Sequence, residues 1–248
     1  MFAIYKKELR SYFINPIGYV FMGIFLVLSA LVCCYTTIIS SSYDTSLYFT
    51  IMIFAFIVLI PLLTMRLFAE ERKMRTEQLL LTAPVTLTGM VTGKFLAAFT
   101  MFSGCMLLSC INFIPLYVIA RIERGNVTYD TMHIGPNTAQ IIGCFIGLLL
   151  IGAAFIAIGT FISSLTENQL AAAVLSIAVI LVLVLIGLVS SLVNVYWIRS
   201  VLDWISILGR FGNLSYGIFD FSAILYYASI AFIFLFLTVR VYEKRRWG

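Results

Sequence analysis

Residues Phe68–Lys94 read FAEERKMRTEQLLLTAPVTLTGMVTGK, and this stretch separates two long apolar runs of the chain. Its first half is a cluster of acidic and basic residues typical of a charged helix. Pro84 then breaks the segment, because proline lacks a backbone N–H and restricts the residue before it. The apolar runs on either side are long enough to cross a bilayer. The sequence therefore predicts a charged segment exposed between two membrane crossings.

The composition excludes an ordinary soluble domain. Hydrophobic residues make up 62% of the 248 positions and charged residues only 11%, against about 25% in soluble chains. A helical span needs roughly 20 apolar residues. Six such runs can be read, at 17–40, 47–65, 89–120, 137–163, 169–193 and 223–240. The third and fourth exceed the length of a span, which predicts tilt or protruding ends. The runs are too long and too evenly apolar for barrel strands. We expect an all-α membrane protein, a six-helix bundle forming one transmembrane domain over 1–248.

Cationic residues divide unevenly between the two sides of such a bundle. With six spans both termini lie on one side, and the 16 Lys and Arg residues divide twelve to four. The larger group comprises Lys6, Lys7, Arg10, Arg66, Arg72, Lys73, Arg75, Lys94, Arg240, Lys244, Arg245 and Arg246. The smaller comprises Arg121, Arg124, Arg199 and Arg210. The positive-inside rule makes the first side cytoplasmic. We therefore expect both termini and residues 66–94 inside, and 121–136 and 194–222 outside. The net charge of +5 reflects topology, and we expect no nucleic-acid partner.

Two segments outside the spans have a character of their own. Residues 2–16, FAIYKKELRSYFINP, place aromatic and cationic side chains on different helical faces, as in a helix lying in the membrane interface. The pair Asn15-Pro16 ends this elbow helix, and an ordinary charged flank is the alternative. Residues 194–222 are apolar but broken by charges and glycines. Short re-entrant or interfacial helices explain them better than a seventh span, in which the charges would be buried at high cost.

The spans contain few side chains that could bind ions or catalyse a reaction. All 27 formal charges, 16 basic and 11 acidic, can be placed outside the apolar cores, whereas ion-coupled transporters usually need an ionisable or coordinating group within the membrane. Asn112, before Pro115, is a candidate pathway residue. The spans contain no His or carboxylate that could activate a Ser or Cys. The chain also has no G-x-x-x-x-G-K-[ST] phosphate loop. The five cysteines lie in apolar runs and His133 stands alone in a loop. We expect no catalytic, cofactor-binding or metal site.

The quoted stretch resembles the cytoplasmic coupling segment of type-2 ABC exporter permeases. In that pattern an acidic-basic cluster leads through a Thr and a Leu-rich turn to a Pro, and then to Gly-Lys at the foot of the next span. The matching positions are Glu70, Glu71, Arg72, Thr76, Leu79, Leu80, Pro84, Gly93 and Lys94. The resemblance covers nearly the whole chain and is nearest to permeases like the gliding-motility-associated ABC permease, with TEQLLLTAPV at 76–85 as its most specific part. One departure is Arg75, where relatives often carry Gly, which puts the local turn in question.

The resemblance implies a permease subunit of an ATP-driven ABC exporter in the plasma membrane of a bacterium. Two such permeases pair, as a homodimer in preference to a heterodimer, above two copies of a separate ATP-binding subunit that holds ATP and Mg²⁺. The permease itself is then no enzyme. The implied coupling residues lie in the segment 66–88: Glu70, Glu71, Arg72, Arg75, Thr76, Glu77, Leu79, Leu80 and Pro84. Glu167 and Asn168, in the turn between the fourth and fifth spans, are candidates for a second cytoplasmic contact, with simple solvation of that turn as the alternative.

Three questions stay open at the level of sequence. The substrate is unknown, and a pathway lined by Phe, Ser, Thr and Met would suit an amphipathic molecule. The competing function is a non-transporting ABC-type scaffold or mechanotransmission subunit that acts on an envelope partner protein. For the charged stretch itself, the alternative is a cytoplasmic loop with no coupling role.

Overall fold

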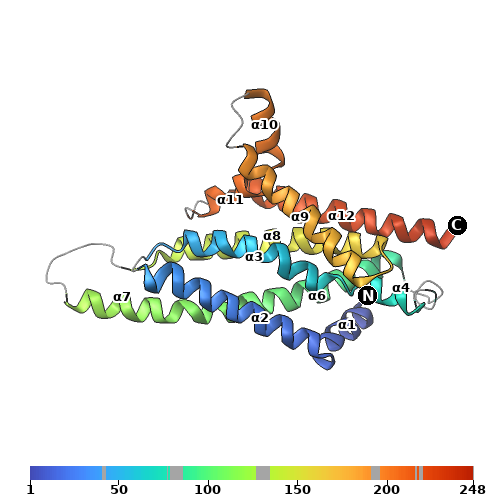
Figure 1. Ribbon diagram of the computed structural model, residues 1–248, viewed down its shortest axis with the longest axis horizontal. Coiled ribbons are helices and arrows are strands. Elements are labelled where there is room, and N and C mark those ends of the chain that lie inside the picture. The colour runs from blue at the N-terminus through green and yellow to red at the C-terminus, as the bar shows by residue number, and fades with distance from the viewer. Residues whose placement is uncertain are drawn as a thin grey trace.

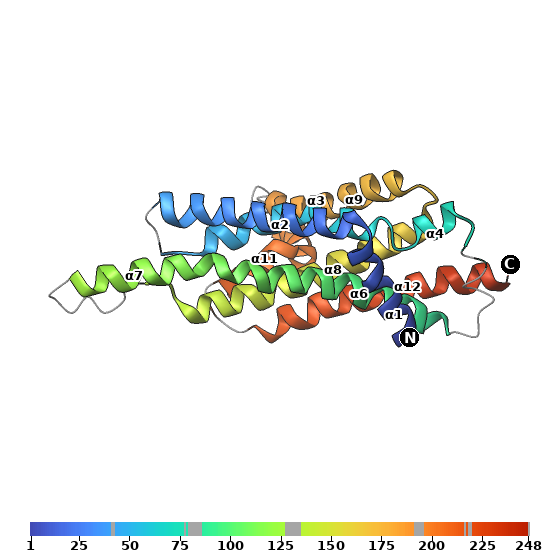
Figure 2. The ribbon, with the colours of Figure 1, turned by 90° about the horizontal axis from the view of Figure 1, so that it is seen from below.

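The chain is described by a computed structural model over residues 1–40, 43–76, 78, 86–126, 135–190, 196–215, 217 and 220–247. Within these ranges it is nearly all helical and has no strand. The long helices run side by side in an elongated bundle (Figure 1). Both termini and the short helix α4 lie at one end, which we call the terminal end, and the view turned by 90° agrees (Figure 2).

Six helices of the described chain are long and apolar enough to cross a membrane, which confirms the predicted bundle. They run Pro16–Ile39, Ser46–Lys73, Leu87–Glu123, Thr138–Leu165, Gln169–Ser190 and Phe221–Arg246. The third span has 37 residues, about 55 Å at 1.5 Å per residue. This exceeds a hydrocarbon core of about 30 Å, so the third span is longer than one crossing needs, and tilt or protrusion of its ends stays a prediction.

Several spans contain more than one helical element. The first consists of α2 (Pro16–Cys33) and the π-helix η1 (Cys34–Ile39). In the second, α3 (Ser46–Thr64) is joined by a turn to α4 (Ala69–Lys73). The third comprises α6 (Leu87–Ser109), the 3₁₀ turn η2 (Cys110–Phe113) and α7 (Ile114–Asn126). The other spans are α8 (Thr138–Leu165), α9 (Gln169–Ser190) and α12 (Phe221–Trp247).

The predicted elbow is the helix α1 (Phe2–Ile14). It ends at Asn15, whose backbone is extended with φ −84° and ψ 144°, and Pro16 then starts α2. The residue before a proline is disfavoured in the α region, whereas proline is well suited to the first position of a helix. This dipeptide therefore both stops the elbow and starts the first span.

Two short helices precede the last span, in place of a seventh crossing. These are α10 (Tyr196–Ile205) and α11 (Ile207–Ser215). They pack against α9 and, in the case of α11, also α8, while α10 points away from the bundle (Figure 1). The first residues of the external segment predicted at 121–136 are helical, because α7 continues to Asn126.

The core sits around α3 and α8, the spans most buried by the rest of the chain. Three aromatic rings join α2, α3 and α6: the ring of Phe102 lies 6.2 Å from that of Phe25 and 5.0 Å from that of Phe56, centroid to centroid. Gly152 brings α8 onto the same cluster, since a Cβ there would lie 2.2 Å from the Phe102 ring. The interior is thus too closely packed for an added methyl group at this point.

Candidate functional site

The charged stretch after the second span lies at the terminal end, and α8 holds it in place. The hydroxyl oxygen of Ser163 accepts hydrogen bonds from the backbone N–H groups of Phe68 and Ala69, each at 3.2 Å, and donates to the carbonyl of Met65 at 3.2 Å. The first N–H groups of a helix have no partner within it, and the phenyl side chain at the N-cap cannot supply one. Ser163 therefore caps α4 from a neighbouring helix.

Gly159, one turn earlier on α8, allows this approach. A Cβ at 159 would lie 2.2 Å from Thr64 Oγ1 at the end of α3. A larger residue would push α8 away and separate Ser163 from the turn that it caps. The small residues at 159 and 163 thus pack α8 against α3 within one chain.

Lys94 is the centre of a buried ion cluster. Its side chain lies in α6 and is 1% exposed. The Nζ atom lies 3.0 Å from Glu8 Oε1 in α1 and 2.9 Å from Glu71 Oε1 in α4, and donates to the carbonyl of Leu67 at 2.6 Å. The ring of Phe68 lies 5.1 Å away. An ammonium group has three donors, and here three oxygen atoms lie within reach. One side chain therefore joins α1, α4 and α6.

Lys7 balances the charge of this group. Its Nζ lies 3.4 Å from Glu71 Oε1 and 3.8 Å from Glu8 Oε1. Two cations then face two carboxylates, so the group is neutral as a whole. Burying an unpaired charge costs several kcal/mol, so the four side chains depend on one another. We call Lys7, Glu8, Glu71 and Lys94 the Lys94 cluster.

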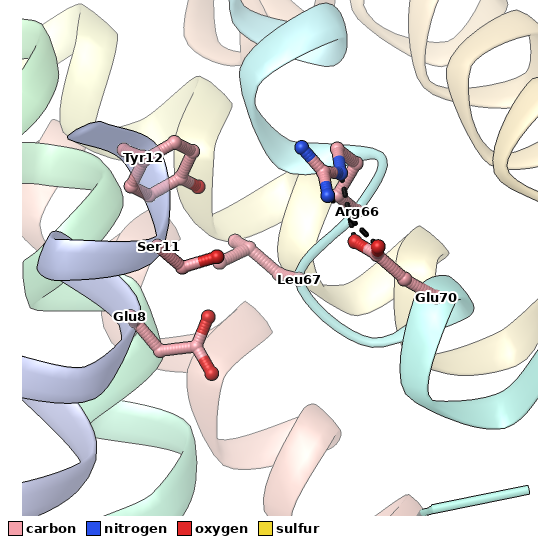
Figure 3. A pocket seen from close by; sticks show the side chains of 6 residues that line it. All are labelled: Glu8, Ser11, Tyr12, Arg66, Leu67 and Glu70. Carbon is pink, nitrogen blue, oxygen red and sulfur yellow. Dashed lines mark hydrogen bonds and ion pairs between the residues drawn. The ribbon is translucent and has the colours of Figure 1, made fainter. Parts of the chain in front are cut away.

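A small polar cavity lies between α1 and the turn after α3 (Figure 3). It has a volume of about 20 Å³ and is lined by Glu8, Ser11, Tyr12, Arg66, Leu67 and Glu70. This is room for about one water molecule. On one side Arg66 donates two hydrogen bonds, of 2.7 and 2.8 Å, to the carboxylate of Glu70. On the other the hydroxyl of Tyr12 donates to the Leu63 carbonyl at 3.1 Å, and burial raises the pKa of Tyr12. The elbow is thus fixed to the end of the second span.

Two cations from other helices cap the end of α8. Arg72 in α4 donates to the carbonyl of Leu165 at 3.0 Å and pairs with Glu167 Oε1 at 2.8 Å. Arg245 in α12 donates to the carbonyl of Ser164 at 2.7 Å. The last carbonyls of a helix lack partners within it, and the helix dipole favours cations there. The two predicted contact regions, the charged stretch and the turn after α8, therefore lie side by side.

The two residues of that turn differ in their surroundings. The Glu167 side chain is 74% exposed, so the pair with Arg72 leaves it accessible from outside. Asn168 Oδ1 accepts the N–H of Leu170 at 3.1 Å, which caps the first turn of α9. Asn168 thus has a local role in starting the fifth span.

The end of α4 shows why glycine would suit the position that Arg75 occupies. The N–H of Arg75 donates to the carbonyl of Arg72 at 3.1 Å, and the N–H of Thr76 to that of Glu71 at 2.9 Å. This pair of bonds defines a Schellman turn, in which the residue after the C-cap is left-handed and usually glycine. Arg75 occupies that position with φ 57°. The turn thus has the conformation that glycine favours, at a steric cost to arginine.

The structure brings together five of the predicted coupling residues: Glu70, Glu71, Arg72, Arg75 and Thr76. The others, Glu77, Leu79, Leu80 and Pro84, lie outside the described residues. The described chain resumes at Thr86, whose Oγ1 accepts the N–H of Gly89 at 3.3 Å and caps α6.

Asn112 lies in η2, away from the terminal end. Its side-chain amide donates to Ser29 Oγ at 2.8 Å, and Ser29 Oγ lies 2.9 Å from the hydroxyl of Tyr48. Hydrogen bonds of this kind join helices within a membrane. The observed partners of Asn112 thus hold the first three spans together, and its place in a pathway stays a prediction.

The sequence pattern did not reveal the members of the site that come from other helices: Lys7, Glu8, Ser163 and Arg245. Arg66 lies within the predicted segment 66–88, in the turn before α4, but was not named as a coupling residue. Lys94 was interpreted only as part of a motif and as a cytoplasmic charge. Two signals were available. Glu8 is the single acidic residue of the elbow, and Lys94 is the single charge between Glu77 and Arg121.

A family model described as an ABC-2 family transporter protein matches residues 36–241 of the chain. The matched range contains α4, α8 and most of α12, and so most of the site, while α1 precedes it. No curated protein matches the chain.

Proposed function

The chain belongs to the ABC-2 family of transporter proteins, and on this premise we propose that it is the permease of an ATP-driven exporter. It is a multi-pass membrane protein. By its family it is the non-catalytic permease subunit of an ABC transporter, and such permeases generally work with an ATP-binding subunit. We propose that ATP and Mg²⁺ bind to that partner, and that its closure drives the spans between inward-facing and outward-facing states.

The observation that carries this proposal is the Lys94 cluster together with the cap from Ser163. Glu71 ties α4 to both α1 and α6, and Ser163 ties the start of α4 to α8. A force on α4 would therefore reach the elbow and the third and fourth spans together. Buried ion pairs resist separation because each partner would be left uncompensated, so these elements should move as one body.

The surface that would receive the ATP-binding subunit lies beside this cluster. Lys73, Met74 and Arg75 are exposed at the end of α4, Met74 by 68%. Glu167 is also exposed, and its ion pair with Arg72 places it beside these residues. An apolar side chain among charges of both signs suits a protein partner. We propose that Leu79 and Leu80 extend this contact.

The terminal end carries most of the cationic residues. Arg66, Arg72 and Lys94 stand in its ion pairs, and the basic end of α12 lies there as well. We therefore propose that both termini are cytoplasmic. The resemblance to bacterial exporter permeases supports a place in the plasma membrane of a bacterium. The subgroup of gliding-motility-like permeases is supported by TEQLLLTAPV at 76–85.

We propose an assembly of two permease chains with two ATP-binding subunits. One six-span chain is half of the usual twelve-span pathway, and nothing in its sequence marks it as half of an unequal pair, which favours a homodimer. An amphipathic substrate suits the Phe-, Ser-, Thr- and Met-rich spans. An auxiliary envelope protein could join the complex, and a complex that binds such a protein without moving any substrate would establish the scaffold function instead.

The test is ATP turnover by the purified complex of permease and ATP-binding subunit. Charge reversal in Arg72→Glu should lower permease-dependent turnover by about fivefold or more, the lower range of coupling energies between sites, while the chain still inserts. Arg199→Glu is the matched control, because Arg199 is an exposed arginine paired with a carboxylate at 3.7 Å on α10. It should leave turnover unchanged.

A charge swap separates docking from internal structure. Arg72→Glu with Glu167→Arg restores the ion pair within the chain, but not the hydrogen bond from Arg72 to the Leu165 carbonyl, and it reverses the surface that a partner meets. If the swap recovers full turnover, Arg72 acts only inside the permease and the docking assignment is wrong. Transport by the permease alone, without any ATP-binding subunit, would end the ABC mechanism.

A further inference from the structure

An apolar groove lies between the elbow α1 and the third span. Met1, Phe2 and Tyr5 form one wall and Leu96 and Thr100 of α6 form the other, and its volume is about 380 Å³. Sites for small ligands have volumes of about 300–1,000 Å³. Phe2 is 76% exposed, so the groove opens to the surroundings of the bundle.

Two cations of the elbow, Lys6 and Arg10, have no partner among the described residues and lie beyond Phe2 on the outer face of α1. Lys6 and Arg10 are exposed, and neither forms an ion pair or a hydrogen bond within the part of the chain that is described. They follow Phe2 by four and eight residues, so at about 100° per residue they lie about 40° and 80° around the helix from Phe2, on the side away from Tyr5. Lys7, by contrast, faces the carboxylates of the Lys94 cluster. The outer face of the elbow therefore carries two uncompensated positive charges.

The same face also presents apolar side chains. Phe13 and Ile14, at the far end of α1, are 44% and 67% exposed. Exposed aromatic and aliphatic side chains beside unpaired cations are typical of helices at the membrane surface. The groove adds a confined apolar space, and the cations make the surroundings of that space attractive to a negative headgroup.

We propose that the groove holds an acyl chain of an anionic phospholipid, whose headgroup phosphate lies against Lys6 and Arg10. The lipid would fill the groove between α1 and α6 that opens to the surroundings of the bundle. The Lys94 cluster joins the same two helices where they are buried. The site requires only that the chain is a membrane protein, so it stands apart from the coupling function. A failure of ATP-dependent transport would leave it untouched.

The experiment measures lipid retention by native mass spectrometry of the full chain in its complex. The probes are phosphatidylglycerol and phosphatidylcholine with identical acyl chains, supplied in equal amounts. The wild-type complex should retain phosphatidylglycerol in preference. The double variant Lys6→Ala/Arg10→Ala should reduce this preference by roughly 25-fold, about fivefold for each cation.

A matched control removes the same charge from the same end of the bundle. Lys244 and Arg246 are exposed near the end of α12, and Lys244→Ala/Arg246→Ala should leave the preference unchanged. If both double variants reduce it equally, the effect is general electrostatics and no lipid site exists. Equal retention of both lipids by the wild-type complex would overturn the proposal as well.

A second pair of variants tests the groove without changing charge. Leu96→Trp fills it, and should release phosphatidylglycerol although both cations remain; Thr100→Trp serves if the first variant does not fold. Leu107→Trp makes the same change at a residue of α6 that is 62% exposed and outside the groove, and should have no effect. Unchanged retention of phosphatidylglycerol in the groove variants would overturn the proposal. If these variants dissociate the permease dimer but still retain the lipid, the groove binds a second copy of the chain instead.

Discussion

The two ends of the bundle are held together by different chemistry. At the terminal end, Lys94 and its carboxylate partners join three helices through buried charges. At the opposite end, α12 is tied to the short helices by hydroxyl groups and by one arginine that has no buried carboxylate partner among the described contacts. The Tyr227 hydroxyl donates to the Ile207 carbonyl at 2.7 Å, and that of Tyr226 to the Ile205 carbonyl. Arg210 of α11 donates to Ser222 Oγ at 3.0 Å and lies over the Tyr226 ring. One ion pair on α10, between Arg199 and Asp203, is exposed and therefore contributes little to stability.

This difference predicts how each end responds to damage. The Lys94 cluster is a many-body arrangement, since the loss of one charge alters the surroundings of three others and of three helices. A tyrosine hydroxyl joins one pair of elements, and its loss leaves a single carbonyl without a partner. An end that transmits force between a partner subunit and several spans needs the first kind of construction. An end that only has to stay closed can use the second.

The largest effect should come from Lys94→Met. Removing the ammonium leaves the carboxylates of Glu8 and Glu71 without their buried partner. The exposed Lys7 and the Glu70-paired Arg66 remain nearby, and breaking a buried pair in this way costs about 3–5 kcal/mol. We expect a large drop in the thermal unfolding temperature of the purified chain. The triple variant Lys94→Met/Glu8→Gln/Glu71→Gln removes all three buried charges and should recover much of the loss. No recovery would show that the cost arises from packing.

Ser163→Ala should rank second. It removes the acceptor for two buried N–H groups at the start of α4, and each unsatisfied group costs about 1–3 kcal/mol. Ser164 is an adjacent control that is equally buried, but its hydroxyl donates only to the Phe161 carbonyl of its own helix. Ser164→Ala should therefore cost less than about 1 kcal/mol, and ATP turnover should fall only in the 163 variant. Equal effects of the two variants on stability and turnover would remove Ser163 from the coupling site.

The elements of the fold were predictable because their signals are local. Each span is encoded by its own run of apolar residues, and the elbow ends at a proline that acts on its immediate neighbour. The short helices before the last span follow from Arg199, Asp203 and Arg210, which cannot be buried cheaply in lipid. The π-helix η1 was not predicted. The hydroxyls of Thr36 and Thr37 donate to carbonyls four residues earlier, a type of bond known to distort helices, but hydropathy does not record it.

The members of the site were predicted in part, but their pairing was not. Glu71, Arg72 and Lys94 belong to the motif and Glu167 was a separate candidate contact, whereas Glu8 was not singled out, and long stretches of chain separate these partners. Such pairs depend on how the helices pack, and a single sequence carries no information on which charges meet. The cap from Ser163 shows the same limit, because one of many serines in the spans was placed next to α4 by tertiary structure alone.

Tyr227→Phe tests the opposite end and should have a smaller effect. Tyr227 is fully buried, and loss of its hydroxyl leaves the Ile207 carbonyl without that hydrogen bond, at a cost of about 1 kcal/mol. We expect a modest fall in the unfolding temperature and no change in ATP turnover, because the hydroxyl joins only α12 and the start of α11. A loss of turnover as large as that of Ser163→Ala would show that the two ends are coupled after all.

The smallest effect, and one of opposite sign, should come from Arg75→Gly. Arg75 is held at φ 57° by the Schellman turn, and the left-handed conformation costs a residue with a Cβ roughly 1 kcal/mol or more. Glycine removes that cost but loses more chain entropy on folding, so the net gain should be a few tenths of a kcal/mol to about 1 kcal/mol. Arg75→Ala removes the same charge while keeping the strain, and should bring no such gain in unfolding temperature. A complex in which both variants bind the ATP-binding subunit equally poorly would assign the guanidinium to docking. One in which only the glycine variant binds better would show that the geometry of the turn, and not the charge, is what the partner recognises.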